Sequence, residues 1–349
     1  MKKLLLMASV LLATGAAQAD DGPLWMRYPA ISPDGTTIAF TYCGDIFTVP
    51  VGGGRATQLT TNPAYDSRPV WSPDGKQIAF ASDREGSFDV FIMSRDGGAP
   101  TRLTTHSTTE IPVAFADSTH VLFAASIQQD YKDIQFPSGQ FSQIYSVSTH
   151  GGRPVMFSSM VMQDLSLNKA GDKLLYQDLK GYEDPWRKHH QSSIARDIWL
   201  CTLGPTRMYK KLTSFRGEDR NPVWAPDGNS YYYLSEQDGS FNVYKSDLSG
   251  ENRVQLTHHT KNPVRFLTVA DNGMLCYGYD GEIYTMREGG QPSKVKVEIV
   301  TDRVENDVIN RTFWGGATTW LCRQTVRKWL SSCVAMCMLR LWIMRRHAR

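Results

Sequence analysis

Short apolar runs that follow polar turns recur along most of the chain. The clearest copies are Ser32-Pro33-Asp34-Gly35 before Ile38-Ala39-Phe40, Ser72-Pro73-Asp74-Gly75 before Ile78-Ala79-Phe80, and Ala225-Pro226-Asp227-Gly228 before Tyr231-Tyr232-Tyr233. Proline presets φ for the second turn position, aspartate bonds back to the backbone, and glycine accepts a positive φ. The branched and aromatic residues that follow favour a buried strand. Each copy therefore predicts a turn that leads into a β-strand.

Three weaker copies keep the same layout. They are Ala116-Asp117-Ser118-Thr119 before Val121-Leu122-Phe123, Lys169-Ala170-Gly171 before Leu174-Leu175-Tyr176, and Asp271-Asn272-Gly273 before Leu275-Cys276-Tyr277. The last turn positions fall at residues 35, 75, 119, 171, 228 and 273, so the spacings are 40, 44, 52, 57 and 45 residues. Repeats of this length are typical of propeller blades.

Two further elements recur within each unit. A strand that alternates apolar and polar residues follows each turn and begins at Asp45, Phe88, Gln143, Asp197, Phe241 and Glu282. A connector precedes the next unit in four places, namely Gln58-Leu59-Thr60, Arg102-Leu103-Thr104, Lys211-Leu212-Thr213 and Gln255-Leu256-Thr257. Alternation of this kind is the pattern of half-buried strands. We therefore predict an all-β fold, a six-bladed β-propeller of four-stranded antiparallel blades over residues 20–290.

Two other features of the propeller follow from the spacings and from the ends of the repeats. The longer third and fourth spacings locate insertions at residues 128–142 and 180–196, and loops of this length on a repeat array often bind partners or simply decorate the surface. Because open sheet edges invite aggregation, we expect Leu24 to Ala30 to pair with the last blade and close the ring.

The N-terminus has the three parts of a secretory signal peptide. Lys2 and Lys3 are followed by a short apolar run and by Ala17-Gln18-Ala19, a small-residue cleavage site. The run is too short and too interrupted to favour a membrane anchor. We predict that residues 1–19 are removed after Ala19, that no membrane span remains, and that the mature protein is periplasmic or secreted.

Charge and cysteine content exclude several classes of function. The net charge is +3, but residues 320–349 contribute +7, so residues 1–319 carry −4. An acidic body gives no electrostatic reason to bind nucleic acid. The six cysteines form no disulfide framework, and Cys333 and Cys337 lack the nearby ligands of a zinc site.

No catalytic, cofactor or metal residue can be nominated, and the residues that bind a peptide or partner stay unassigned. Glycine-serine pairs at Gly86-Ser87 and Gly239-Ser240 read as turns before strands, since no G-x-S-x-G elbow, H-E-x-x-H or Walker sequence is present. The adjacent histidines His189-His190 and His258-His259 would point to opposite faces of a strand, so surface-loop residues are the preferred interpretation over a chelate.

The repeat unit, the Gln-Leu-Thr connector and the Asp-Ile-Phe strand together resemble the TolB-like propeller repeat. Over residues 20–319 the chain resembles bacterial tricorn protease homologues more narrowly, above all in Pro23 to Gly35 and in Glu305 to Arg311, which is similar to the entry of a second propeller. The resemblance implies that residues 291–319 are a linker and the start of that second propeller. TolB itself differs, because a small α/β domain precedes its propeller.

In that family, the resemblance implies, two propellers precede a PDZ domain and a serine peptidase active site, and the propellers admit unfolded peptides or release products. None of the catalytic positions can be carried over to this sequence. Peptides or unfolded polypeptide, and the missing C-terminal peptidase region, are thus the expected partners. The chain alone is predicted to be inactive. An autonomous TolB-like periplasmic propeller that binds a protein or peptide is the alternative, and a remnant of a prolyl-oligopeptidase-type enzyme is a third.

Residues 320–349 break the pattern, with no glycine, proline or aspartate and with clustered tryptophan, cysteine, methionine and arginine. A one-base shift near codon 319 explains this change. Codons compatible with residues 322–332 can then read Ser-Pro-Asp-Gly, one unassigned residue and Glu-Val-Ala-Phe-Val, which is the expected turn and strand. We predict a frameshifted tail, from a lesion or a sequencing error. A basic, surface-binding amphipathic helix is the structural alternative.

Overall fold

The repeated turns form through the residues that define them. In a computed structural model, which describes residues 23–127, 141–181, 189, 191–300, 317–322, 329–333 and 336–339, Asp34 Oδ1 accepts hydrogen bonds from Ser32 Oγ at 2.5 Å and Thr36 N at 3.0 Å. These bonds, with that from Ser32 first, hold the pKa of Asp34 well below its ordinary value. The turn glycines have positive φ, namely 70° at Gly35, 66° at Gly75 and 67° at Gly228. The predicted turn chemistry is therefore confirmed.

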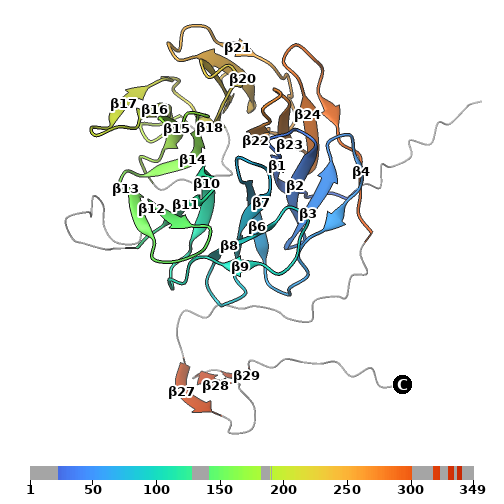
Figure 1. Cartoon of the computed structure of the whole chain (residues 1–349), viewed down its shortest axis with the longest axis vertical. Coiled ribbons are helices and arrows are strands. Elements are labelled where there is room, and N and C mark those ends of the chain that lie inside the picture. The colour runs from blue at the N-terminus through green and yellow to red at the C-terminus, as the bar shows by residue number, and fades with distance from the viewer. Residues whose placement is uncertain are drawn as a thin grey trace, which may run out of the picture. The chain divides into compact units, whose positions relative to one another are not determined.

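Six four-stranded antiparallel sheets surround one axis in the unit Met1–Val300 (Figure 1). Blades 1 to 3 are β1 (Arg27–Ile31), β2 (Thr37–Tyr42), β3 (Asp45–Pro50) and β5 (Thr57–Gln58); β6 (Asp66–Trp71), β7 (Gln77–Ser82), β8 (Asp89–Ser94) and β9 (Thr101–Arg102); and β10 (Ile111–Asp117), β11 (His120–Ala125), β12 (Gln143–Ser148) and β13 (Val155–Ser158). Blades 4 to 6 are β14 (Met162–Leu167), β15 (Lys173–Asp178), β16 (Ile198–Thr202) and β17 (Met208–Lys211); β18 (Asp219–Trp224), β19 (Ser230–Ser235), β20 (Asn242–Asp247) and β21 (Val254–Gln255); and β22 (Arg265–Val269), β23 (Leu275–Tyr279), β24 (Glu282–Met286) and β25 (Ser293–Lys294). The predicted six-bladed propeller is confirmed.

The core of the propeller is divided into six hydrophobic wedges, one between each pair of neighbouring blades. Because the strands are short and alternate, each sheet buries both faces against its neighbours. Two tryptophans also bond across the wedges: Trp71 Nε1 donates to Ala30 O and Trp224 Nε1 to Ser166 O, both at 2.9 Å. Packing between blades, and not within a blade, therefore holds the ring together.

The connector threonines have a structural task that the sequence repeats. Each hydroxyl accepts the backbone N–H of the third strand at 2.9 Å, in the pairs Ile46 with Thr60, Val90 with Thr104, Ile198 with Thr213, and Val243 with Thr257. All four threonines are buried. The connector is thus hydrogen-bonded to the third strand of its own blade before the chain crosses to the next blade.

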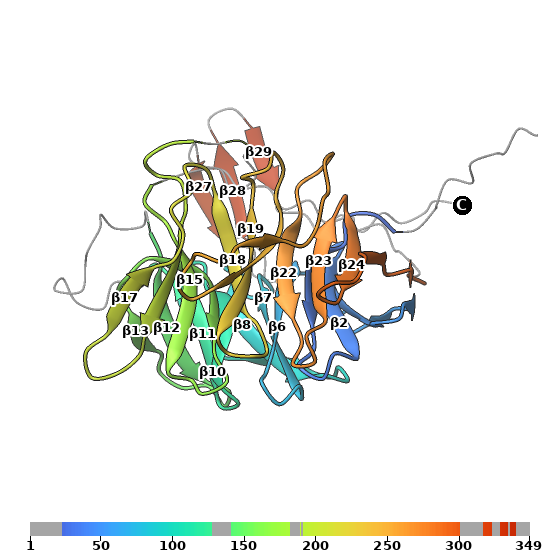
Figure 2. The same ribbon diagram turned by 90° about the horizontal axis from the view of Figure 1, so that it is seen from above.

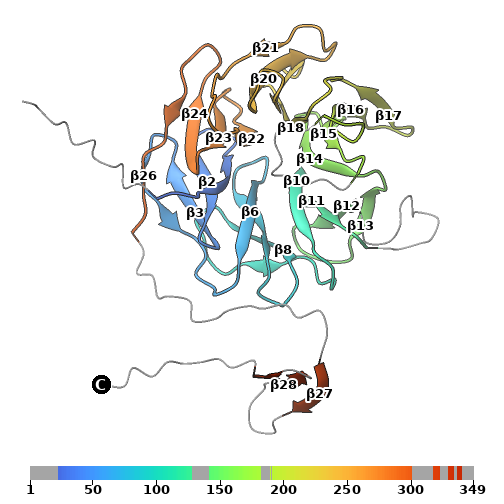
Figure 3. The same ribbon diagram turned by 180° about the vertical axis from the view of Figure 1, so that it is seen from behind.

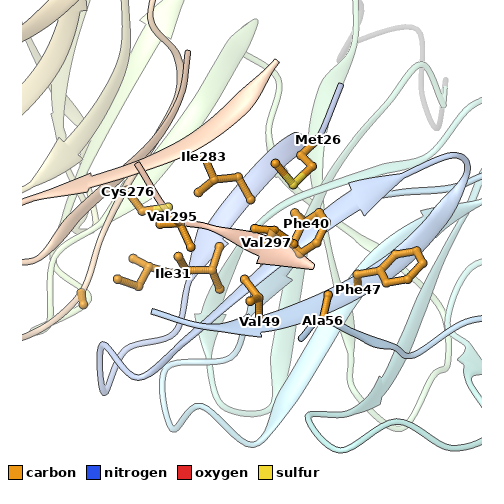
Figure 4. Close-up of a cluster of buried hydrophobic side chains, with 12 residues drawn as sticks. Met26, Ile31, Phe40, Phe47, Val49, Ala56, Cys276, Ile283, Val295 and Val297 are labelled. Atoms are coloured by element: carbon orange, nitrogen blue, oxygen red, sulfur yellow. The ribbon is translucent and has the colours of Figure 1, made fainter. Parts of the chain in front are cut away.

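Residues after the last blade close the ring. β26 (Val297–Glu298) pairs in parallel with β4 (Gly54–Arg55) of blade 1, as Figure 3 shows from behind. Val295 and Val297 are packed into the wedge between blades 6 and 1, where Met26 and Phe40 also lie (Figure 4). These residues fall in the segment 291–319 that the sequence assigned to a linker.

We predicted that Leu24 to Ala30 would pair with the last blade and close the ring, and this strand pairing was wrong. β1 pairs with β2 of its own blade, and only single hydrogen bonds reach blade 6, such as Met26 N to Gly281 O at 2.9 Å. The physical reason is that blade 6 already has four strands from its own segment of chain, β22 to β25, and β1 is the first strand of blade 1.

The unit Thr301–Arg349 contains a three-stranded antiparallel meander of β27 (Ala317–Cys322), β28 (Trp329–Cys333) and β29 (Met336–Leu339). The predicted signal peptide lies outside the described residues. Within those residues, no helical segment has the length and hydropathy that a membrane crossing requires.

Candidate functional site at the propeller axis

The inner strand of every blade contains a β-bulge at which extra residues oppose the second strand. In five blades the first residue of the bulge has a positive φ, between 48° and 59°, although none is glycine. We name the bulge residues of blades 1 to 6 the axial ring: Tyr28, Arg68, Val113, Asp164, Asn221 and Phe266. Bulges re-aim side chains, and positive φ at such residues costs on the order of 1–3 kcal/mol each.

Five members of the axial ring share a positive φ at equivalent positions of the inner strands, whereas Val113 packs against the core wedge between blades 3 and 4. Each inner strand contacts the inner strands of both neighbouring blades, and Figure 2 turns the propeller so that β6, β18 and β22 are seen from the side. Three consecutive members touch one another: the Tyr28 and Phe266 ring centroids lie 4.6 Å apart, and the Arg68 guanidinium lies 4.8 Å from the Tyr28 ring. Blades 6, 1 and 2 therefore form one aromatic wall with a cation stacked on it.

Asp164 lies on the opposite part of the ring. Asp164 occupies in blade 4 the bulge position that Arg68 occupies in blade 2, and both residues have a positive φ. Surrounding protein raises the pKa of Asp164, and the charges of Arg68, Arg220 and Arg196 oppose that change. The side chain nevertheless remains exposed to solvent.

A hydrogen-bonded chain fixes the ring between blades 4 and 6. Gln177 Nε2 donates to Gln163 Oε1 at 3.1 Å, and Gln177 Oε1 accepts Asn221 N at 2.9 Å. The Asn221 amide then bonds to both backbone groups of Leu267, at 3.1 and 2.7 Å. Asn221 is therefore a positioning residue, while Arg68 and Asp164 are the charged members of the ring.

A buried ion cluster contains two arginines whose charges act on the pKa of Asp164. Glu218 Oε2 lies 3.2 Å from Arg196 Nη1 and 2.9 Å from Arg220 Nε, and all three residues are buried. Burial acts to raise the pKa of Glu218, but the charges and hydrogen bonds of the two arginines outweigh it and the net change is downward. The cluster carries one net positive charge, so the field that it adds near Asp164 favours anions.

Exposed aromatic residues adjoin the ring at the end where the inner strands begin. Trp25 and Tyr65 are 69% and 43% exposed, and Tyr65 packs edge-on against Phe88 at 6.3 Å. Burial raises the pKa of Tyr65, and the charges of Arg27 and Arg68 oppose the rise, which places Tyr65 beside the ring. An apolar surface with arginines leads into the axial ring.

The predicted insertions both connect the second and third strands of a blade, between β11 and β12 and between β15 and β16. Most of residues 128–142, together with 182–188 and 190, lie outside the described residues. Where the chain is described, the turns at Gly86 and Gly239 form with positive φ, as predicted. Loops between second and third strands share one end of the propeller, the end where the inner strands begin.

The histidine pairs behave differently from each other. His189 N donates to Glu236 Oε2 at 2.6 Å, and His190 lies outside the described residues. His258 is exposed, whereas His259 is half-buried and stacks on Tyr279 at 3.9 Å, and burial lowers the pKa of its imidazole. Among the described residues no cluster of side chains could hold a metal ion.

One pocket of about 560 Å³ lies on the outer rim between blades 5 and 6. Its walls are the β21 edge, Val254 to His259, and the turn from Glu288 to Pro292. It is remote from the inner strands and shares no residue with the axial ring. The concave rim pocket and the axial ring are separate sites.

Sequence reasoning missed the axial ring, because its members share no residue type. A signal was nevertheless present. Tyr28, Arg68, Asp164, Asn221 and Phe266 each lie seven residues before the glycine that ends the following turn. These five residues therefore share a distance from the turn and a positive φ. The distance can be read from the sequence, but the positive φ is seen only in the structure.

The geometry defines a six-bladed propeller whose inner strands carry aromatic, cationic and anionic side chains in the axial ring. The family model of the tricorn protease N-terminal beta propeller domain matches residues 23–291, more than half of the chain. The chain belongs to this family, and the predicted resemblance is confirmed.

The tricorn proteins that this chain resembles are longer than it is. It is 24% identical over 305 residues to tricorn protease homolog 1 of Streptomyces coelicolor, covering 85% of this chain and 27% of the relative. An uncharacterized protein of Agrobacterium fabrum, Atu1656, is 37% identical over 215 residues, covering 58% of this chain and 68% of that protein. The crystal structure of the tricorn protease superimposes with a TM-score of 0.66 at 19% identity, covering 81% of this chain and 27% of that one. The chain thus spans about a quarter of the tricorn relatives, and the last match concerns the fold alone.

Proposed function

We propose that this chain is the substrate-gating, peptide-binding N-terminal propeller of an exported tricorn-like serine peptidase, without the catalytic region. The axial ring carries the proposal. Its charged and aromatic side chains stay at the axis although five of the six bulges adopt strained backbone conformations. Strain kept at a shared location is a mark of function and not of stability.

The chemistry of the ring suits an unfolded polypeptide. Aromatic faces such as Tyr28 and Phe266 contact aliphatic and peptide surfaces of any sequence, while Arg68 and Asp164 bind charged groups. A folded domain cannot reach side chains that lie on inner strands. The partners are accordingly extended peptides and the peptidase region that lies beyond this chain in the longer relatives.

Binding and hydrolysis should separate in the purified chain. We expect it to bind a carboxymethylated, permanently unfolded polypeptide, measured by fluorescence anisotropy, and to cleave no fluorogenic peptide above a mock purification. Tyr28→Asn should weaken binding, because asparagine accepts the positive φ but removes the aromatic wall. Tyr209→Asn on the outer strand β17 is the matched control, since Tyr209 is 40% exposed and far from the axis. Hydrolysis beyond the mock control, or equal loss of binding in both variants, would sink the proposal.

An autonomous TolB-like propeller that binds a protein or peptide partner is the second candidate. The observation that favours it is the closed ring: β26 and β4 complete the seam inside the unit Met1–Val300. A saturable partner from the cell envelope, bound with no peptidase region present, would support this candidate over the first.

Export is part of the proposal and has its own test. The mature N-terminus should be Asp20, read by N-terminal sequencing of protein from the periplasmic or culture fraction. An N-terminus at Met1 in a cytoplasmic fraction would contradict it.

We also propose that residues 320–349 arise from a shifted reading frame. The antiparallel meander of β27, β28 and β29 resembles the start of a blade and supports a propeller repeat at this place. A fresh DNA read across codons 310–360 and beyond decides the matter. A shifted frame that continues into a second propeller is expected, and a confirmed frame with a stop after Arg349 overturns the idea.

A further inference from the structure

We propose that β17, the outer strand of blade 4, is an open sheet edge to which a partner protein adds an extended segment. The segment carries an acidic residue and an apolar residue two positions apart. β17 lies on the rim of the propeller (Figure 1), so the inference does not rest on the proposed role of the axial ring. Main-chain hydrogen bonds hold such a strand, and side chains select its sequence.

β17 is the longest regular outer edge among the six blades that the structure describes. The outer strands of blades 1, 2, 5 and 6, namely β5, β9, β21 and β25, have two residues each. β13 has four residues, as β17 does, but its pairing with β12 contains a register shift. β17 pairs with β16 without a shift, and all four of its residues are exposed. Short strands and bulges blunt sheet edges, so β17 is the edge left open.

A proline directly precedes three of the other outer strands and does not precede β17. Pro100, Pro154 and Pro292 stand immediately before β9, β13 and β25. Proline has no N–H group to donate, and it is common on edge strands that pair no further. The residue before β17 is Arg207, and β17 itself contains no proline. Each residue of β17 therefore keeps its main-chain donor.

The ladder of blade 4 shows which main-chain groups of β17 face the open side. Leu212, directly after β17, donates its N–H to Ile198 O at 2.9 Å. Because opposite residues of an antiparallel pair alternate between bonded and non-bonded positions, every second residue of β17 bonds inward to β16. The N–H and C=O groups of the other two, Tyr209 and Lys211, therefore point away from the sheet. They are available to an added strand.

Two side chains on one face of β17 select the added strand. Met208 and Lys210 share a face, because side chains alternate along a strand, and Met208 is 70% exposed. The Lys210 ammonium donates to Leu248 O at 2.8 Å, which fixes its position and leaves two N–H donors. An antiparallel strand meets Lys210 first and Met208 two residues later. An acidic residue followed at the second position by an apolar one therefore fits this face.

Charge favours an acidic partner over a second copy of this chain. Residues 198–217 contain no acidic residue and four cations, Arg207, Lys210, Lys211 and Arg216, although residues 1–319 carry −4. The flanking acids, Asp197 and Glu218, are ion-paired, with Lys211 and with the two buried arginines of the ion cluster. Antiparallel pairing of two β17 strands would bring the cations together, and like charges that face each other on a sheet are destabilising. The same lysines thus oppose self-association and attract an acidic strand.

The test uses the full chain and a peptide blocked at both ends, Ser-Thr-Glu-Thr-Ile-Thr-Ser, with binding followed by fluorescence anisotropy. The parent chain should bind it saturably, and a peptide with lysine in place of glutamate should bind about fivefold or more weakly. Lys210→Glu should reverse this order, so that the lysine peptide binds better. Lys76→Glu, at a side chain of blade 2 that is 79% exposed, is the matched control and should keep the order of the parent.

Hydrogen exchange followed by NMR locates the bound strand. Saturating peptide should slow the exchange of the Tyr209 and Lys211 amides and leave that of Lys210, which already bonds inward, unchanged. A second variant tests the apolar position. Met208→Thr keeps a residue that favours strands, so it should retain the melting temperature of the parent and lose the preference for isoleucine over serine in the peptide.

Three results would overturn the proposal. The first is equal binding of the two peptides to the parent, or binding of neither. The second is protection confined to the amides of another edge or of the inner strands. The third is concentration-dependent dimerisation in sedimentation velocity that protects the same amides without peptide, since it would assign β17 to a second copy. Because the rim is separate from the axis, each of these results leaves the proposed function of the axial ring untouched.

Discussion

The free energy of unfolding of the parent chain should fall as pH rises, because the buried Glu110 becomes ionised. Glutamine at this position should prevent that fall. Glu110 precedes β10, and Asp89 begins β8 of the neighbouring blade; both side chains are 0% exposed. Asp89 has one cation, Arg102, at 2.8 Å, while Glu110 has none: its Oε2 accepts the backbone N–H of His106 at 3.2 Å, and a hydrogen bond with Thr104 also acts to lower its pKa. Burial, helped by the charge of Asp89, raises the pKa of Glu110 to about 7.

The sign and size follow from that pKa. A carboxyl whose pKa is higher in the folded state than in the unfolded state binds its proton more tightly when folded, so its stabilising effect is complete below about pH 4.5 and is lost as pH rises through about 7. At roughly 1.4 kcal/mol for each pH unit, the change from 4.5 to about 7 corresponds to at most about 3 kcal/mol. Glutamine mimics the protonated acid at every pH.

Urea unfolding followed by tryptophan fluorescence measures this effect on the full chain between pH 5 and pH 9. The free energy of unfolding of Glu110→Gln should exceed that of the parent chain by an amount that grows with pH toward about 3 kcal/mol. Glu251→Gln, at an exposed residue, should run parallel to the parent and serves as the control. Parallel curves for Glu110→Gln and the parent would show that the pair of buried acids does not titrate in this range.

Three smaller predictions concern how the blades are joined. Thr104→Val should cost about 1–3 kcal/mol in urea unfolding, since the buried amide of Val90 loses its acceptor, and Thr104→Ser should restore most of it. Trp71→Phe should cost about 1 kcal/mol through the lost bond to Ala30 O, plus any packing loss, and a melting temperature equal to that of the parent would contradict the inter-blade role. Val297→Asp should speed hydrogen exchange of the β4 amides while the β9 amides keep their rates, and uniform acceleration would refute a local seam.

Local chemistry made the blades predictable. The turn that contains Ser72, Asp74 and Gly75 uses hydrogen bonds and a φ that only a few residue types provide, so its clear copies mark three blades and weaker copies mark the rest. The connector threonines are equally local in effect, because each bonds a strand about fourteen residues away. Signals of this kind depend on residue identity and survive in a single sequence.

The ring closure and the axial ring were not predictable by the same means. Val295 and Val297 read as an ordinary linker, and their partners lie at the other end of the propeller. Arg68 and Asp164 share their strain and their distance of seven residues from the turn glycine but no chemical type, so residue identity does not link them. Properties that arise only when the first and sixth blades meet, or when six inner strands face one axis, need the assembled structure.

The seam at β26 also has a mechanical meaning. Its two main-chain hydrogen bonds, from Gly54 N to Lys296 O and from Ala56 N to Glu298 O, both at 2.8 Å, are the last attachments of the propeller before residue 300. A pulling force that arrives from residues beyond 300 is therefore applied first to this clasp, ahead of any complete blade. The ring has a defined weak link, and tension on the following segment would open the wedge between blades 6 and 1 while the other five stay shut.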